Sequence, residues 1–312
     1  MVTNERPVVD ENAVIPDAQA RTLAEVEERG GLPVPAWLKI IWQNKKARFG
    51  LVVLGFFVVV AVFAPLIAPH DPRNNDFVPF SEPSGTHLLG TTQAGEDIFS
   101  QFVYATRTSL IVGVLAGGMA TIIGLIIGMI AGYAGGVVDE VLNFFINLAL
   151  VIPLLPLMIV IAAYSPVKGL VTVIIVIGIT SWAGGARLKR SQMISLKERD
   201  YITASLFAGD SMWRIVFREI MPNMTSLIVV GFLGAAIGAI GAESGLSFIG
   251  VGDPLTISWG TMMLWANNSG ALLGGQWWWV FPPGIALAVL ITALAFVNFG
   301  IDAISNPHLR EE

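Results

Sequence analysis

Six apolar stretches alternate with polar segments along the chain. They cover residues 49–68, 109–133, 142–163, 169–185, 225–245 and 281–303. An α-helix needs about twenty apolar residues to cross the hydrocarbon core of a bilayer, and most of these stretches approach that length. The pattern therefore predicts an all-α polytopic membrane protein with six transmembrane helices.

The positive charges between these stretches predict the orientation of the helices. The segment between the fourth and fifth stretches carries Arg187, Lys189, Arg190, Lys197, Arg199, Arg214 and Arg218. Short loops rich in Lys and Arg remain in the cytoplasm, so this segment is expected on the inner side. Lys39, Lys45, Lys46 and Arg48 place the amino-terminal side there as well, and six crossings return the carboxyl terminus to it.

Two segments precede the first apolar stretch. Residues 1–36 are polar and rich in Asp and Glu, and they lack the basic start and apolar core of a signal peptide. They are expected to form a disordered, acidic cytoplasmic tail. Residues 37–48 place Trp37, Ile41 and Trp42 on one helical face and gather cations at their end, which predicts an interfacial helix.

Composition narrows the function classes. Hydrophobic residues make up 54% of the 312 residues and charged residues 13%, so lipid is expected to be the main solvent. No Lys/Arg block has the density of a nucleic-acid surface, and the chain has no cysteine for disulfides or thiol chemistry. His70, His87 and His308 lie far apart in sequence, so we expect no metal site. No polar catalytic cluster is visible, and we expect no catalytic residues.

Glycines recur at helical spacing in two of the stretches. GxxxG pairs in the second stretch predict close helix packing; they are 113/117, 124/128, 128/132 and 132/136. The fifth stretch carries Gly231, Gly234, Gly238, Gly241 and Gly245. These glycines are compatible with either tight packing or sliding of that helix.

The transmembrane region is expected to cover residues 49–303, with a long cytoplasmic loop at 186–224 and a cytoplasmic carboxyl terminus at 304–312. In the loop, Ile202, Leu206 and Phe207 share one helical face. Gly209 can end that helix in the left-handed conformation. Asp210 or Ser211 can then cap a second helix that reaches Phe217 and stops before Pro222. A helix pair of this kind is typical of a docking element for another protein.

The same loop resembles the cytoplasmic signature of permease subunits in binding-protein-dependent ABC importers. That signature is Glu-Ala-Ala, three residues, then Gly, followed later by Ile and a Leu-Pro pair. The matching positions are Thr203, Ala204, Ser205, Gly209, Ile215 and Met221-Pro222. The family's glutamate is replaced by Thr203 and its second alanine by Ser205.

Further motifs resemble the dipeptide/oligopeptide branch of that family. They follow the family's order along the chain: Ala64-Pro65-Leu66-Ile67-Ala68-Pro69, Leu89-Gly90-Thr91, Arg107-Thr108-Ser109-Leu110, Gly245-Leu246-Ser247-Phe248-Ile249-Gly250 and Asn306-Pro307-His308. In the loop that follows Leu89, Thr92 and Glu96 replace the family's aspartate and arginine. The resemblance covers residues from about 40 to 310.

The resemblance implies a type I ABC importer permease fold and a bacterial or archaeal plasma (inner) membrane location. It also implies partners: a second homologous permease, two ABC ATPase subunits, an extracytoplasmic substrate-binding protein and membrane lipid. ATP and Mg would be bound by the ATPase subunits, since this chain has no GxxxxGKS/T phosphate loop and no cofactor of its own is expected. The implied ATPase-coupling residues are Tyr201, Thr203, Ala204, Ser205, Leu206, Phe207, Gly209, Asp210, Ile215 and Pro222.

Four residues in the stretches are candidates for a translocation path or gate. Glu243 is a carboxylate inside a predicted span, where an ionisable group indicates function by default, although a structural hydrogen bond is the alternative. Asn143 and Asn147 share a face of the third stretch and can line a polar path or bond across helices. Pro153 can kink that helix beside a path or only for packing.

The substrate is not specified by these residues. The resemblance implies import of di- or oligopeptides, and oligosaccharides of the cello-oligosaccharide type are an alternative, because Trp277, Trp278 and Trp279 could stack on sugars as well as form an interfacial belt. A secondary transporter or channel is the alternative from another class. It would be expected to show inverted repeats or paired charges at mid-membrane, and a membrane enzyme would need a polar catalytic cluster.

Overall fold

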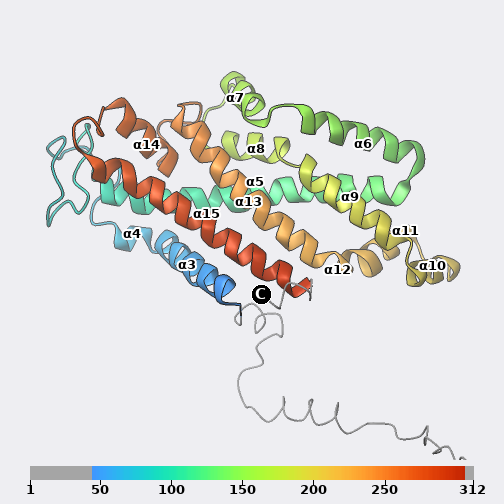
Figure 1. Cartoon of the computed structure of the whole chain (residues 1–312). Helices are drawn as coiled ribbons and strands as arrows, with labels where there is room; N and C mark the ends of the chain where they lie inside the picture. The colour runs from blue at the N-terminus through green and yellow to red at the C-terminus, as the bar shows by residue number, and fades with distance from the viewer. Residues whose placement is uncertain (1–43, 306–312) are drawn as a thin grey trace, which may run out of the picture. The chain divides into compact units, whose positions relative to one another are not determined.

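The computed structural model describes residues 44–305, with side chains to residue 302 (Figure 1). The predicted tail at 1–36, most of the predicted interfacial helix and residues 306–312 lie outside this part. Within it the regular secondary structure is helical, apart from one isolated β-bridge between Thr91 and Asp97. The all-α prediction is confirmed.

The helices follow one another with short connections, except for two longer segments after α4 and α13. Their bounds are α3 Lys45–Val62, α4 Ala64–Ile67, α5 Ile98–Ala134, α6 Gly136–Val151, α7 Leu154–Tyr164, α8 Leu170–Thr180, α9 Ala183–Lys197, α10 Asp200–Phe207, α11 Met212–Arg214, the π-helical segment η1 Ile215–Ile220, α12 Met221–Asn223, α13 Thr225–Phe248, α14 Trp259–Asn268 and α15 Trp277–Ser305.

Four helices in the described part are long and apolar enough to cross a membrane, and the bent pair α6 and α7 makes up to five. The first predicted span, 49–68, is interrupted. Its helix α3 already begins at Lys45, so the first turn holds the cations that were expected to end a separate interfacial helix. The helix ends at Val62, one residue before the Pro-containing α4. The apolar part of α3 is therefore shorter than predicted.

The helix predicted at 109–133 is much longer, because α5 already begins at Ile98 and has 37 residues. Asp97 caps it by accepting a hydrogen bond from the backbone N–H of Ser100. The first turns of α5 carry polar residues such as Gln101 and Thr106, which are buried rather than exposed to lipid. Because these residues are polar, the apolar stretch seen in the sequence did not include this part of the helix.

The helix predicted at 142–163 is broken by a bend of 88° between α6 and α7. Pro153 lies at the break and disfavours a helical conformation in the residue before it, so Ile152 is extended. The α6 helix also begins earlier than predicted, at Gly136, since Gly135 and Gly136 both have positive φ and form the turn after α5. Pro153 is thus the site of a real break.

The core is organised around α5, which packs against α9, α13 and α8, while α15 packs against α3 and α13. Glycines of α5 allow the closest approaches. A Cβ on Gly128 would lie 2.5 Å from the carbonyl oxygen of Ala186 on α9, and one on Gly117 would lie 2.7 Å from the backbone N of Ala236 on α13. These contacts hold the helices that position the sites described next.

Candidate functional site

A helix pair lies at one end of the bundle, and α14 lies at the other (Figure 1). The first helix of the pair, α10, ends at Phe207, and Gly209 follows with φ +80°. The N–H of Asp210 donates to the carbonyl of Ser205 over 3.1 Å, and the N–H of Gly209 donates to that of Leu206 over 3.1 Å. Gly209 therefore makes the left-handed turn predicted from the sequence.

The second helix of the pair is longer than predicted. Ser211 caps it, with its hydroxyl accepting from the N–H of Arg214 over 3.4 Å, but the helix does not stop at Phe217. It continues through the π-helical segment η1 into α12, which contains Pro222. Proline is tolerated there because it occupies the first turn of α12, where a missing N–H is not needed.

One face of the helix pair is anchored under the bundle. Ile202 of α10 and Ile215 and Ile220 of η1 are fully buried, in a cluster that includes Met129 of α5 and Met193 of α9. Ile202 was predicted to share a face with Leu206 and Phe207. In the structure it points into the cluster while the other two are exposed. The anchored face fixes the orientation of the pair.

Several other side chains of the pair are apolar or aromatic and exposed. Phe207 is 89% exposed and Trp213 is 72% exposed, and the ring of Trp213 stacks on Phe217 with centroids 5.5 Å apart. Leu206, Met212 and Tyr201 add to this surface. We call Tyr201, Leu206, Phe207, Met212, Trp213 and Phe217 the aromatic docking face.

The remaining predicted coupling residues surround this face. Thr203 and Ala204 are exposed on α10, and the hydroxyl of Ser205 donates to the carbonyl of Tyr201 over 3.1 Å. Asp210 pairs with Arg214 at 3.0 Å, and Pro222 is exposed. Except for the buried Ile215, the predicted residues are thus exposed or partly exposed on the helix pair and its continuation into α12.

The candidate path residues are not brought together in the same way. Asn147 accepts a hydrogen bond from Arg187 Nη2 of α9 over 2.5 Å, so it does bond across helices. Asn143 is half-buried one turn earlier on α6. Near the start of α6, Asp139 forms a bidentate ion pair with Arg190 of α9, at 2.5 and 2.6 Å. These polar contacts hold α6 against α9.

Glu243 lies elsewhere, on the buried side of α13. Its carboxylate accepts hydrogen bonds from Ser247 Oγ over 2.8 Å and Ser244 Oγ over 3.3 Å, and it also interacts with the hydroxyl of Ser258. Ser258 caps α14. Within residues 44–305 no hydrogen bond joins Glu243 to Asn143, Asn147 or the Pro153 break, and its contacts are those of a structural polar network between α13 and α14.

The tryptophan run does not form an open stacking platform. Trp279 is buried, Trp278 packs against the core, and Trp277 alone of the three is well exposed. Lys189, counted with the loop cations, is also buried, and its ammonium group lies beside Gly185 and Gly231. The burial of Trp279 and of Lys189 results from tertiary packing, which the sequence pattern does not predict.

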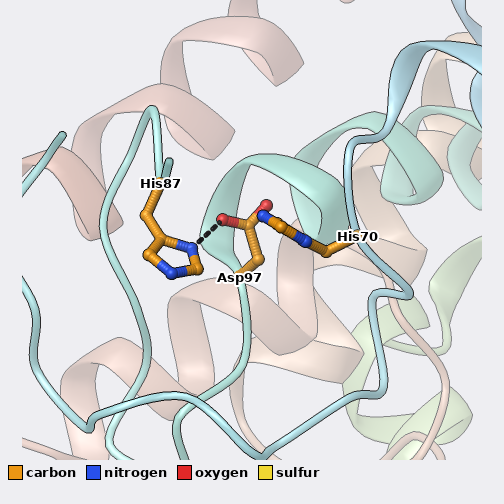
Figure 2. A group of neighbouring side chains, drawn as sticks. All are labelled: His70, His87 and Asp97. Carbon is orange, nitrogen blue, oxygen red and sulfur yellow. Dashed lines mark hydrogen bonds and ion pairs between the residues drawn. The ribbon is translucent and has the colours of Figure 1, made fainter. Parts of the chain in front are cut away.

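A polar cluster in the loops before α5 was missed from the sequence. His70, His87 and Asp97 offer ligand atoms that all lie within 4.8 Å of one another (Figure 2). They come from three separate positions along the chain, so no local spacing could reveal them. The one sequence signal was Asp97 itself, an acidic residue of the type that caps helices, directly before α5.

Comparison with known families shows to which family the chain belongs. Residues 124–311 match the family model of the binding-protein-dependent transport system inner membrane component. The chain belongs to this family. Residues 36–83 match the model of the N-terminal TM domain of oligopeptide transport permease C, which confirms the resemblance to the dipeptide/oligopeptide branch.

Curated relatives extend over most of the chain. It is 34% identical to the dipeptide transport system permease protein DppC of Bacillus subtilis over 88% of this chain and 85% of the relative. It is 34% identical to the oligopeptide transport system permease protein OppC of the same organism, over 86% and 88%. The di/tripeptide permease DppC of Pseudomonas aeruginosa is 31% identical over 89% and 95%.

A solved structure shares the fold. A chain of the MetNI methionine ABC transporter in an inward-facing conformation has a TM-score of 0.52 at 18% identity, covering 66% of this chain and 95% of that chain. The fold is therefore that of an ABC importer permease. Membership in the binding-protein-dependent family decides against the secondary transporter and channel alternatives.

Proposed function

We propose that this permease forms one half of the translocation pathway of an ATP-driven importer for di- or oligopeptides. The names of the relatives, which refer to dipeptide, oligopeptide and di/tripeptide transport, support peptides over the oligosaccharide alternative. The burial of Trp279 also removes part of the aromatic surface that favoured sugars. A second permease of the same family completes the pathway, and an external binding protein delivers the peptide.

The observation that carries this proposal is the aromatic docking face. Exposed apolar surface of this kind marks an interaction site, because water solvates it poorly. Its helices are nevertheless fixed by the buried Ile202, Ile215 and Ile220, so the face is rigid enough to transmit force in either direction. A rigid apolar surface at one end of a membrane bundle fits a protein partner there.

The distribution of charge supports a cytoplasmic position for that partner. The helix pair carries or adjoins Lys197, Arg199, Arg214 and Arg218, and clusters of cations beside membrane spans remain in the cytoplasm. We therefore place the docking face and both termini in the cytoplasm of a plasma (inner) membrane. There the proposed partner is an ABC ATPase, which supplies the ATP and Mg sites.

The proposed coupling uses the helix pair, the membrane helices and the buried contacts that join them. Closure of two ATPase subunits on ATP would displace the helix pair, and the pair would tilt the helices to which it is anchored. Such a rigid-body switch links nucleotide binding to access from one side of the membrane or the other. The binding protein acts from the opposite side, near the loops before α5 and α14.

The first experiment tests the docking face directly. Phe207→Asp puts a charge on the most exposed residue of the aromatic docking face, and we expect the ATPase subunits to be lost when the tagged chain is purified from its native membrane. Leu273→Asp is the matched control, since Leu273 is 97% exposed but lies between α14 and α15. Retention of the ATPase subunits by Phe207→Asp would contradict the docking assignment.

The second experiment tests the turn. Gly209→Val should uncouple ATP hydrolysis from peptide uptake, because a β-branched residue is strained at φ +80°. Gly209→Asn should keep much of the coupling, since Asn adopts this conformation more readily. No atom lies within 4 Å of a Cβ at this position, so steric contact does not complicate the comparison. Equal uptake by Gly209→Val and wild type would reject the role of the turn.

A further inference from the structure

The histidine cluster joins three segments of the loop region that precedes α5. His70 follows α4, His87 lies in the loop that leads to α5, and Asp97 is the cap of α5. Figure 2 shows the two imidazole rings on either side of the Asp97 carboxylate. Two of the three histidines of the chain, which the sequence separates by 17 residues, thus converge on one buried carboxylate.

Each group is held in place by contacts outside the cluster. Asp97 is fully buried, and its Oδ2 accepts from the backbone N–H of Ser100 over 2.8 Å and from Ser100 Oγ over 2.7 Å. Its Oδ1 is left to face His87 Nδ1 at 2.9 Å. The backbone N–H of His70 donates to the same Ser100 hydroxyl over 3.2 Å. Such outer contacts orient metal ligands in proteins.

Aromatic packing and a carbonyl complete the surroundings. The ring of Phe77 lies 4.8 Å from that of His70 and 4.6 Å from that of His87, centroid to centroid. His70 Nε2 lies 3.1 Å from the carbonyl oxygen of Thr86. A carbonyl oxygen can only accept, so this contact keeps a proton on Nε2 of His70. The ring of Phe77 thus packs against both imidazoles, and the carbonyl oxygen of Thr86 lies beside the cluster.

We propose that His70, His87 and Asp97 bind one divalent transition-metal ion of the zinc class. Two imidazoles and a carboxylate are ligands that zinc commonly takes, with water able to fill a fourth position. The 2.9 Å between His87 Nδ1 and Asp97 Oδ1 is close to the about 3.3 Å edge of a tetrahedral zinc site with bonds of about 2.0–2.1 Å.

Two ligands bound to one zinc lie at most about 4.2 Å apart, given bonds of about 2.1 Å, whereas the cluster spans up to 4.8 Å. To reach the about 3.3 Å edge of a tetrahedral site, the farthest ligand atoms would have to approach one another by about 1.5 Å. The ion would then tie the segments around His70 and His87 to the start of α5.

This site departs from the expectation of no metal, which rested on sequence spacing alone. It is also independent of the proposed transport function, because it involves neither the docking face nor a substrate. Its test can therefore fail while the transport proposal stands, and the reverse is equally true.

The test is zinc binding to the full-length chain in a lipid nanodisc, purified through a tag without histidine and stripped with a chelator. Calorimetric titration with zinc chloride should show uptake of one ion per chain. His87→Gln and Asp97→Asn should weaken that binding at least about tenfold, whereas Asp76→Asn, in the same loop region but outside the cluster, should leave it unchanged. Asn retains the capping ability of Asp97, so the fold of α5 is preserved.

A spectroscopic measurement on the wild type does not depend on any variant folding. X-ray absorption of the zinc-loaded chain should show imidazole ligands, and zinc should raise the thermal unfolding temperature of the wild type but not that of His87→Gln. Absence of zinc uptake, an oxygen-only coordination shell or unchanged affinity in His87→Gln would each overturn the proposal.

Discussion

Helices α5 and α13 both carry glycines three or four residues apart, but the two sets of glycines lie in different surroundings. On α5, a Cβ at Gly124, Gly128 or Gly132 would lie under 3 Å from the backbone of α9 or of its N-cap Trp182, and one at Gly117 would meet α13. On α13, Gly234, Gly238, Gly241 and Gly245 are exposed and have no atom within 4 Å of a Cβ.

A glycine pattern therefore predicts close packing only where another helix of the same chain faces the glycines. The partners of α5 are Ala186 on α9 and Ala236 on α13, so backbones approach closely. The exposed glycines of α13 occupy the face opposite its buried residues, including Glu243. In the single chain this face is unoccupied by any described helix.

The largest effect is expected from Gly128→Ala. The new Cβ would lie 2.5 Å from the carbonyl oxygen of Ala186, and neither backbone can yield without separating α5 from α9. We expect a loss of about 1–3 kcal/mol in the free energy of unfolding. Thermal unfolding in detergent, followed by tryptophan fluorescence, would measure it. A stability equal to that of the wild type would remove the basis of the comparison.

The next effect is expected from Glu243→Ala, which tests the buried side of α13. Removing the carboxylate leaves the hydroxyls of Ser244 and Ser247 without their acceptor in a buried place, at a cost of about 1–3 kcal/mol. Gly241→Ala, two residues away on the exposed face, is the control. If both substitutions had the same effect in the unfolding assay, the two faces of α13 would not differ as described.

A smaller effect is expected from Asp139→Asn, which probes the other side of α9. The ion pair with Arg190 is partly exposed, so its loss should cost about 1 kcal/mol. Exchange of the two charges, Asp139→Arg with Arg190→Asp, should restore part of the stability. Unfolding measured at low and high salt separates this charge effect from packing, and an equal loss in the single and exchanged variants would argue against the pair.

The smallest effect, with the opposite sign, is expected from Gly234→Ala. No atom obstructs a Cβ there, and replacing glycine inside a helix restricts the unfolded chain, so stability should rise by about 0.5 kcal/mol. The same unfolding assay applies, with Gly128→Ala measured beside it. A clear destabilisation would show that the exposed face of α13 is occupied in the preparation.

Local signals in the sequence were sufficient for several features. Gly209 predicted the turn of the helix pair because a left-handed residue is a local requirement, and Pro153 predicted the break because proline acts on its own neighbour. The GxxxG pair 132/136 was misleading, since Gly136 lies in the turn after α5 rather than in a helix contact. The predicted stop before Pro222 was wrong because η1 brings the proline into a first turn.

Features that depend on distant parts of the chain could not be predicted. The start of α5 was missed because its first turns hold polar residues that are buried in the fold, such as Gln101, whose Nε2 donates to the carbonyl oxygen of Pro72. The meeting of His70, His87 and Asp97 depends on the same loops. The burial of Ile202 beside the exposed Phe207 was also missed, since helical spacing shows which residues are neighbours but not which face meets the bundle.

The length of α5 has a mechanical consequence. At 37 residues and about 1.5 Å per residue, the helix is about 55 Å long, and no proline interrupts it. One end begins at Asp97, and near the other end the carbonyl of Tyr133 accepts from Lys197 Nζ over 2.6 Å. An unhinged rod of this length is a lever: a tilt of about 5° moves its tip by about 5 Å, close to one helical turn. A small displacement at the Tyr133 end of α5 would thus reach its Asp97 end without any change in the internal structure of the helix.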